Sequence, residues 1–308
     1  MAGVLIGFAI IGTVIATGYV VGRIGILGPS ASYVLGRAAF FVFLPALLFG
    51  VMVDADLTQL FSSILQVSAL GSLACMLAFV LVARLWWARR APQLIIGALS
   101  SGYVNSHNIG LPLAAYVLGD PTLVAPVILL QVVIIAPIAI ILLDISTSGR
   151  LSLRRIVLQP LRNPILIASV LGLVVALLGW QLPDPVLEPF RLLGAAGVPV
   201  ILFVFGLSLS TSRVLAPGTG RRDVLLAVIL KSIAMPLVAW GLGALVFGLT
   251  GTVLFAVVVF AALPTAQNIY TYAVRYDTAI PLARDTGLIT TVLAVPILVL
   301  IAALLAPS

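Results

Sequence analysis

The 308-residue chain is 62% hydrophobic and only 8% charged, and its mean hydropathy is +1.29. This composition excludes an ordinary soluble domain and indicates an integral membrane protein. The net charge of +7 does not indicate a nucleic-acid partner, because the basic residues fall mostly in short loops, where they orient membrane spans. The single cysteine, Cys75, excludes an intramolecular disulfide.

Apolar segments of about 20 residues, the length that crosses a bilayer, follow one another along the whole chain. They predict an all-α protein with ten transmembrane helices. The expected spans lie near residues 2–22, 33–53, 59–84, 92–118, 122–144, 161–181, 189–211, 223–248, 251–275 and 280–306.

Ten spans place the connecting loops alternately on two sides, and the charges then sort between them. One side receives Arg23, Arg84, Arg89, Arg90, Arg150, Arg154, Arg155, Arg213, Arg221, Arg222, Arg275 and Arg284. The other side receives Arg191 with Asp54, Asp56, Asp120, Asp184 and Glu188. The positive-inside rule assigns the first side to the cytoplasm. We therefore expect a multi-pass protein of the inner (plasma) membrane with both termini outside.

Five spans per half force the second half into the membrane with the opposite orientation, which is the arrangement of an inverted repeat. We expect one repeat in residues 1–148 and its inverted counterpart in residues 149–308. Prolines recur at corresponding places in the two halves, Pro45 with Pro199 and Pro137 with Pro296.

A polar patch at residues 105–112 interrupts the fourth span. Gly110 and Pro112 are expected to unwind the helix, because proline removes a backbone donor and clashes with the preceding turn. The amides of Asn105 and Asn108 can hold a carboxylate without carrying charge. In the alternative interpretation, the two asparagines only cap the broken helix ends.

A second patch at residues 263–270 repeats this pattern in the ninth span, with Pro264 as the helix breaker. Gln267 and Asn268 are its candidate substrate-binding amides. Paired breaks in corresponding spans of two halves are the sequence feature that best indicates the midplane site of a secondary transporter.

His107 and Lys231 are the candidates for proton coupling. His107 is the only histidine, and it could carry a proton or be a buried neutral side chain. Lys231 lies deeper in its span than a loop charge, although a lysine there could also extend its ammonium to the membrane surface.

Asn163, which follows Arg162 and precedes Pro164, either caps the sixth span or lies at the mouth of a cavity.

These motifs resemble the auxin efflux carrier family, which includes plant PIN auxin exporters and bacterial organic-acid permeases. The resemblance is carried by four motifs in order: Asn105 with Gly110-Leu111-Pro112, Arg162-Asn163-Pro164, Lys231 with Pro236, and Ala262-Leu263-Pro264. It covers essentially the whole chain, without the long cytoplasmic loop of the plant exporters.

The resemblance implies a fold like that of bile-acid sodium symporters, with a scaffold and a mobile transport domain. Spans one, two, six and seven would form the scaffold, through which a homodimer could assemble, and spans four and nine would cross at Pro112 and Pro264. Asn105 and Asn163 match asparagines that contact a substrate carboxylate. The extra polarity of His107, Asn108 and residues 267–270 suits a smaller, more polar acid than an indole acid.

We therefore expect a secondary transporter that moves a small organic anion across the bilayer by an elevator mechanism. The alternative is a carrier of the same fold for Na⁺ or H⁺, but such carriers generally need mid-span carboxylates. An intramembrane enzyme would need a nucleophile–base pair or a metal cluster, which one histidine and one cysteine do not supply. No catalytic residue, metal, cofactor or nucleic-acid partner is expected. A receptor role would leave the paired breaks unexplained.

Overall fold

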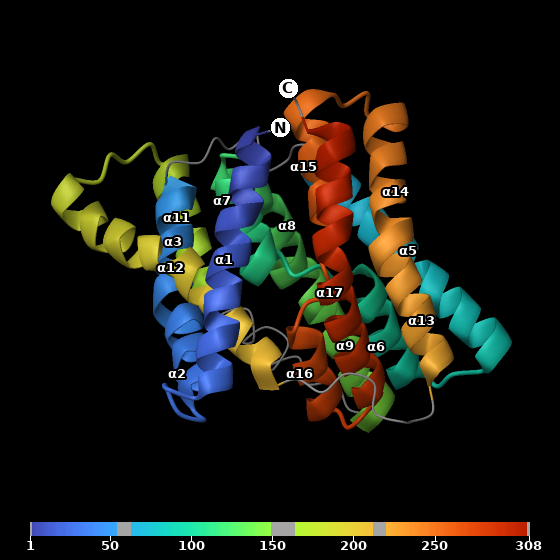
Figure 1. Cartoon of the computed structure of the whole chain (residues 1–308). Coiled ribbons are helices and arrows are strands. Elements are labelled where there is room, and N and C mark those ends of the chain that lie inside the picture. The colour runs from blue at the N-terminus through green and yellow to red at the C-terminus, as the bar shows by residue number, and fades with distance from the viewer. Residues whose placement is uncertain (1, 54–62, 149–163, 212–219, 307–308) are drawn as a thin grey trace.

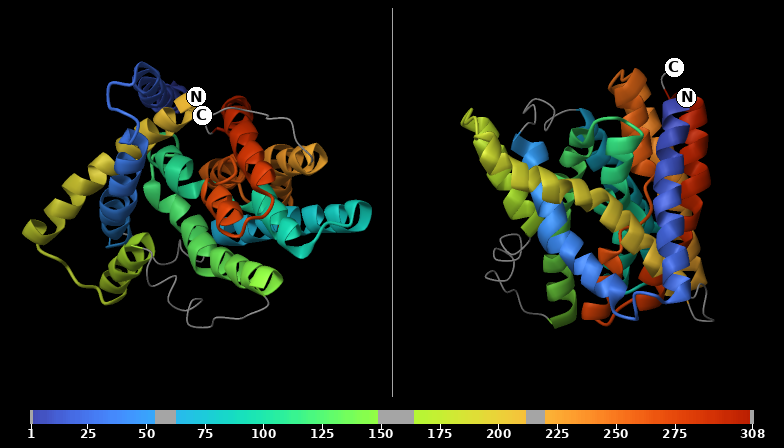
Figure 2. Two further views of the ribbon diagram at one scale, coloured as in Figure 1. Left: turned by 90° about the horizontal axis from the view of Figure 1, so that it is seen from below. Right: turned by 60° about the vertical axis from the view of Figure 1, so that its left-hand side comes forward.

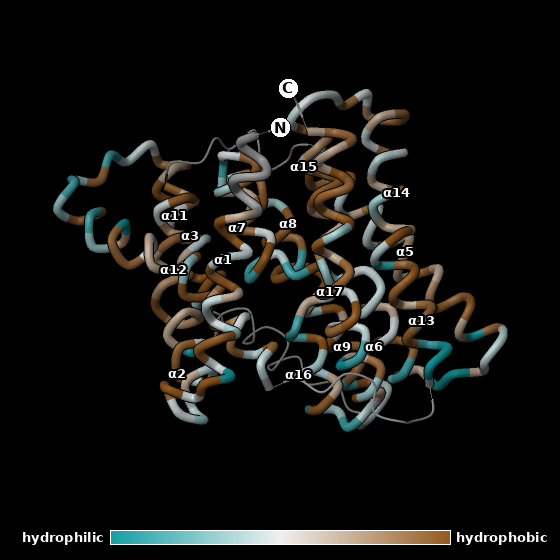
Figure 3. Tube along the Cα trace, viewed as in Figure 1, coloured by the Kyte–Doolittle hydropathy of each residue, from teal (hydrophilic) through white to brown (hydrophobic). Residues whose placement is uncertain are grey.

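The computed structural model describes residues 2–53, 63–148, 164–211 and 220–306. Within these ranges the chain is helical, and its only β-type pairing is an isolated bridge between Val104 and Thr265. Apolar segments form helices because each helix satisfies its own backbone hydrogen bonds, which hydrocarbon cannot do. Figure 3 shows hydrophobic residues along the helices and hydrophilic ones at many of their ends, as at the turn between α5 and α6.

The described helices fall on the predicted hydrophobic segments. Their bounds are α1 (Ala2–Ile24), α2 (Ala31–Ala38), α3 (Leu44–Val53), α5 (Ser63–Trp87), α6 (Ala91–Gly102), α7 (Leu111–Tyr116), α8 (Ala125–Leu129), α9 (Ala136–Ser148), α11 (Pro164–Leu177), α12 (Asp184–Thr211), α13 (Arg221–Ile229), α14 (Met235–Gly241), α15 (Gly251–Ala262), α16 (Asn268–Arg275) and α17 (Ile280–Leu305). Short 3₁₀ and π-helical turns join several of them into longer stretches.

Six of these continuous stretches within the described residues are long and apolar enough to cross a membrane. They are Ala31–Val53, Ser63–Trp87, Pro121–Thr147, Asp184–Ser210, Arg221–Val246 and Ile280–Leu305. Shorter apolar helices cover Ala9–Ile24, Pro164–Leu177 and Gly251–Ala262. These stretches indicate a multi-pass membrane protein whose described residues are helical.

A wide π-helical turn precedes four of the prolines that lie within helical stretches. The turns are η1 (Ala39–Phe43) before Pro45, η2 (Ser106–Gly110) before Pro112, η4 (Leu130–Ile135) before Pro137 and η6 (Leu230–Ala234) before Pro236. In each case the residue before the proline donates its N–H to the carbonyl five residues earlier. The wider turn accommodates the missing proline N–H, so the helix continues instead of ending.

The helices pack in two groups (Figures 1 and 2). In the first helix group α1 packs along α12, and α3 packs against α11 and α12, with α2 beside them. The second helix group contains α5 to α9 and α13 to α17. The groups meet where α7 and η2 contact α1 and α12.

Within the first helix group, α1 and α12 approach each other closely at two glycines. A Cβ on Gly206 would overlap the carbonyl oxygen of Ile15, and one on Gly18 would overlap that of Phe203. Small residues at helix interfaces allow such close packing in a membrane.

The chain termini lie at one end of the molecule in Figure 1. At the opposite end, the turn between α5 and α6 is tied to the start of α13 by an ion pair. The guanidinium of Arg89 donates to both carboxylate oxygens of Asp223, at 3.1 and 2.7 Å.

Candidate functional site

Two helices of the second helix group are interrupted in the interior, and the interruptions cross. The chain is extended at Tyr103 to Asn105, between α6 and η2, and again between α15 and α16. The two extended segments pair in antiparallel fashion: Asn105 N–H donates to the Pro264 carbonyl at 2.8 Å, and Ala266 N–H donates to the Tyr103 carbonyl at 3.1 Å. Each break therefore supplies hydrogen-bond partners for backbone groups that the other break leaves unpaired.

A side chain of the second break and one of the neighbouring turn η4 bond further carbonyls near the breaks. Thr265 Oγ1 donates to the Ser100 carbonyl at 2.7 Å, near the end of α6. Gln131 Nε2 donates to the Val104 carbonyl at 2.9 Å, and its Oε1 accepts from Ser106 Oγ at 2.6 Å. Because unpaired polar groups in hydrocarbon are costly, this network fixes the crossing in one arrangement.

The first break lies earlier than the sequence suggested. Gly110 lies in the π-helical turn η2 and Pro112 in the first turn of α7, both after the extended segment. Pro264 lies inside the second break. A Cβ on Gly110 would approach Leu263 Cδ1 to 2.9 Å, so Gly110 allows η2 to pack closely against the other crossing segment.

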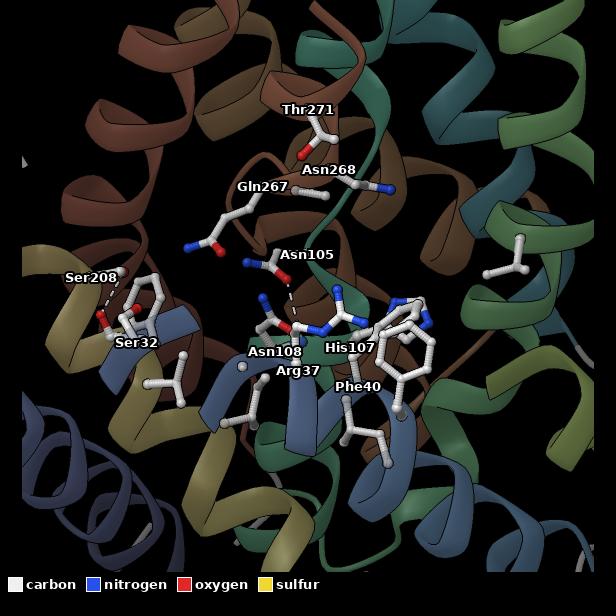
Figure 4. A pocket seen from close by; sticks show the side chains of 18 of the residues that line it. Ser32, Arg37, Phe40, Asn105, His107, Asn108, Ser208, Gln267, Asn268 and Thr271 are labelled. Carbon is white, nitrogen blue, oxygen red and sulfur yellow. Dashed lines mark hydrogen bonds between the residues drawn. The ribbon is translucent and has the colours of Figure 1, made fainter. Parts of the chain in front are cut away.

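A cavity of about 760 Å³ lies between this crossing and the first helix group. The predicted binding residues that line it are Asn105, Asn108, Gln267 and Asn268, and His107 lines it too (Figure 4). The facing wall comes from α2, η1 and α12 and includes Ser32, Arg37, Phe40, Phe205 and Ser208. The structure thus places side-chain amides from both breaks around one cavity.

Three buried polar atoms of these residues have no hydrogen-bond partner within the described chain: Asn105 Nδ2, His107 Nε2 and Asn268 Oδ1. The Asn105 Oδ1 accepts from the Asn108 backbone N–H at 3.3 Å, so the oxygen caps the helix while the nitrogen remains available. The capping and binding interpretations of Asn105 are therefore compatible. A buried donor without a partner is costly, and a bound ligand would remove that cost.

Lys231 is not among the residues that line the cavity. The Lys231 side chain is fully buried in η6 and does not extend to the surface. Its Nζ donates to the Ala261 carbonyl at 2.6 Å and contacts Met235 Sδ at 3.2 Å. Lys231 thus caps the end of α15. Asn163 lies outside the described residues.

Two residues that the sequence analysis did not single out belong to the site. Arg37 lines the cavity from α2, and Gln131 braces the crossing from η4. Each is a polar side chain within an apolar span, the same signal that drew attention to Lys231. No aspartate or glutamate is among the described residues that line the cavity.

Comparison with known proteins shows similarity to membrane transport proteins. A family model described as membrane transport protein matches residues 4–302. The chain is 31% identical to a probable auxin efflux carrier component 5c from Oryza sativa subsp. japonica over 151 residues, which are 47% of the chain and 40% of the relative. It is 29% identical to auxin efflux carrier component 6 from Arabidopsis thaliana over 143 residues, which are 45% of the chain and 25% of the relative.

Both matched stretches cover less than half of the plant relative. The family model, in contrast, extends over nearly the whole chain. This match confirms the predicted family resemblance and identifies a transporter and not an enzyme. The chain belongs to the membrane transport protein family that includes the auxin efflux carriers.

Proposed function

We propose that the chain is a secondary transporter of a small organic anion. The observation that carries this proposal is the unpartnered Asn105 Nδ2 beside a cavity lined by further amides. Amide donors can bind a carboxylate without the desolvation cost of a second buried charge. The absence of carboxylates from the described lining disfavours the alternative, a carrier whose main cargo is Na⁺ or H⁺.

The cargo would move by an elevator mechanism, with the first helix group as scaffold and the second as transport domain. The packing supports this division, because the cavity lies between the groups and the crossing belongs wholly to the second. The proposed inverted repeat, residues 1–148 and 149–308, would supply one broken helix from each half. Ten spans and a homodimer through the scaffold remain part of this proposal.

The orientation follows from the charges. The cavity reaches Ser32 and Ser208, near the ends of α2 and α12 that lie away from the chain termini (Figure 1). Arg89 and Arg221 line a second pocket at that end of the molecule. The positive-inside rule makes this end cytoplasmic. The structure would then be an inward-facing state in the plasma membrane, with both termini outside.

His107 is the proposed site of proton coupling. The Ser106 hydroxyl donates to Gln131 Oε1, so its oxygen is left to accept from His107 Nδ1, 3.4 Å away. We infer that Nδ1 carries the hydrogen of the neutral ring, which leaves a lone pair on the unpartnered Nε2. This nitrogen could accept a transported proton or a hydroxyl group of the cargo.

The first experiment is a thermal-shift screen of the purified protein with malonate, indole-3-acetate and other carboxylic acids. An acid at 100 times its Kd should stabilise the protein by about 2.7 kcal/mol. Asn105→Ser is the matched variant, because serine can still cap the helix but lacks the free amide. Stabilisation that is lost in this variant supports the proposal. A response to Na⁺ or pH but to no acid would favour the cation carrier.

A further inference from the structure

Arg37 is a cation within an apolar membrane span. It lies in α2, inside the stretch Ala31–Val53 that is apolar enough to cross a bilayer. Charged residues in such spans are costly, and they usually face a partner or a wet cavity. Arg37 faces the cavity between the two helix groups.

The guanidinium of Arg37 is held in place by aromatic residues of its own helical stretch. Its Nη1 donates to the Tyr33 hydroxyl at 3.2 Å, and its Cζ lies 5.6 Å from the Tyr33 ring centre and 5.0 Å from that of Phe41. Among the described residues, none of the ion pairs involves Arg37. The charge is therefore oriented but is not neutralised by a carboxylate of the described chain.

Arg37 also differs from the other residues around the cavity. The described polar lining consists of hydroxyls, amides, the His107 ring and Arg37, so Arg37 is its only permanently charged side chain. It comes from the first helix group, whereas Asn105 and Asn268 come from the second. Figure 4 shows Arg37 on the side of the hollow opposite Asn268.

We propose that Arg37 is the ionic partner of the cargo carboxylate and determines the preference for anions. The carboxylate would be shared between the Asn105 amide of one helix group and the Arg37 guanidinium of the other. This inference rests on the proposed organic-anion function and adds the residue that recognises the charge. Guanidinium suits the role because its planar donors match a carboxylate and it stays charged.

The arrangement has a consequence for transport. Arg37 belongs to the proposed scaffold, so it does not travel when the transport domain slides. The anion is held by both groups in the described state and leaves Arg37 behind during translocation. Arg37 therefore strengthens binding on the side to which this cavity opens.

The test measures the Kd of malonate for the purified full chain by thermal-shift titration. Arg37→Gln should weaken binding by about 10- to 100-fold, as expected for loss of a hydrogen bond to a charged group. Arg37→Lys should recover part of the loss, since it restores the charge without the planar donors. Arg23→Gln is the matched control, because it removes an arginine of the same helix group that does not line the cavity.

Dimethyl malonate, which has no charge, separates charge recognition from cavity shape. The wild type should prefer malonate to the ester, and Arg37→Gln should lose that preference. Tyr33→Phe provides a second test if Arg37→Gln fails to fold. It keeps the charge and the aromatic ring but removes the hydroxyl that accepts from Arg37, and should weaken malonate binding by about 2- to 10-fold.

The outcomes separate the two proposals. If no acid binds the wild type, the organic-anion function itself fails. If the wild type binds malonate or indole-3-acetate and the folded Arg37→Gln variant binds it with the same Kd, only the role of Arg37 fails. In a third outcome, Arg37→Gln leaves the malonate Kd unchanged but abolishes the stabilisation of the protein by added phosphatidylglycerol. Arg37 would then bind a lipid phosphate, and the inference would be overturned.

Discussion

The backbone N–H of Asn105 donates to the carbonyl of Pro264 at 2.8 Å. Asn105, whose side-chain nitrogen has no partner within the described chain, is thus anchored by Pro264 in the other break. Neither broken helix can change its conformation at the crossing without breaking this bond. The position of the Asn105 side chain therefore depends on both interrupted helices, although they are far apart in the sequence.

Removal of the Thr265 hydroxyl should destabilise the crossing. Thr265 is buried, and its Oγ1 donates to the Ser100 carbonyl at 2.7 Å. Thr265→Val leaves that carbonyl unpaired and should cost about 1–3 kcal/mol. Thr265→Ser retains the hydroxyl and should cost less. Thermal unfolding of the purified variants measures the difference, and equal midpoints for both variants would contradict the assigned role of this bond.

Lys231→Met should leave the protein folded but impair transport. The substitution removes the cost of burying an amino group that forms no ion pair among the described residues. It also leaves the Ala261 carbonyl at the end of α15 without its partner. We expect stability within about 1 kcal/mol of the wild type. Malonate uptake into proteoliposomes should fall, with Leu230→Met as the control. Normal uptake would show that the capped end of α15 is not needed for movement.

Gly206→Ala should separate α1 from α12. The added Cβ would overlap the carbonyl oxygen of Ile15, which belongs to the backbone and cannot rotate away. Overpacking of this kind costs about 1–3 kcal/mol. Gly12→Ala is the matched control, since nothing lies within 4 Å of its added Cβ. A lower unfolding midpoint only for Gly206→Ala is expected, and equal midpoints would contradict the close packing of these two helices.

His107→Asn should preserve binding and remove the pH dependence of transport. Asparagine can place an N–H near the position of Nδ1 and keep the bond to Ser106, but it supplies no basic nitrogen in place of Nε2. The other titratable groups that line the cavity are Arg37, Tyr33, Tyr103 and Tyr272. In water arginine stays charged and tyrosine changes charge only well above pH 8, so histidine is the only one of these lining side-chain types that titrates between pH 5 and 8.

Malonate uptake measured across that pH range checks this prediction. Malonate uptake by the wild type should vary with pH, and uptake by His107→Asn should not. Retention of the full pH profile in His107→Asn would exclude the histidine as the coupling group. Loss of malonate binding in the variant would instead indicate that the ring contacts the cargo directly.

The sequence by itself determined the all-helical, membrane-spanning class, because hydrocarbon requires long apolar segments whose backbones bond internally. It also indicated the amides Asn105, Asn108, Gln267 and Asn268, since polar residues beside helix breakers are conspicuous in apolar spans. The exact position of the first break was not evident. Proline suggests a break at Pro112, but the π-helical turn before it absorbs the missing N–H, and the chain is extended earlier, at residues 103–105.

Only the tertiary structure decided which residues meet. Arg37 and Gln131 each look like an isolated polar residue in its own span, and the sequence does not say which faces a cavity and which braces a carbonyl. Lys231 has the same sequence signal, yet it is buried against Ala261 and away from the cavity. Helix periodicity fixes a residue's place along one helix, whereas its partners depend on how that helix packs against others. That packing placed Arg37 of one helix group across a cavity from the amides of the other.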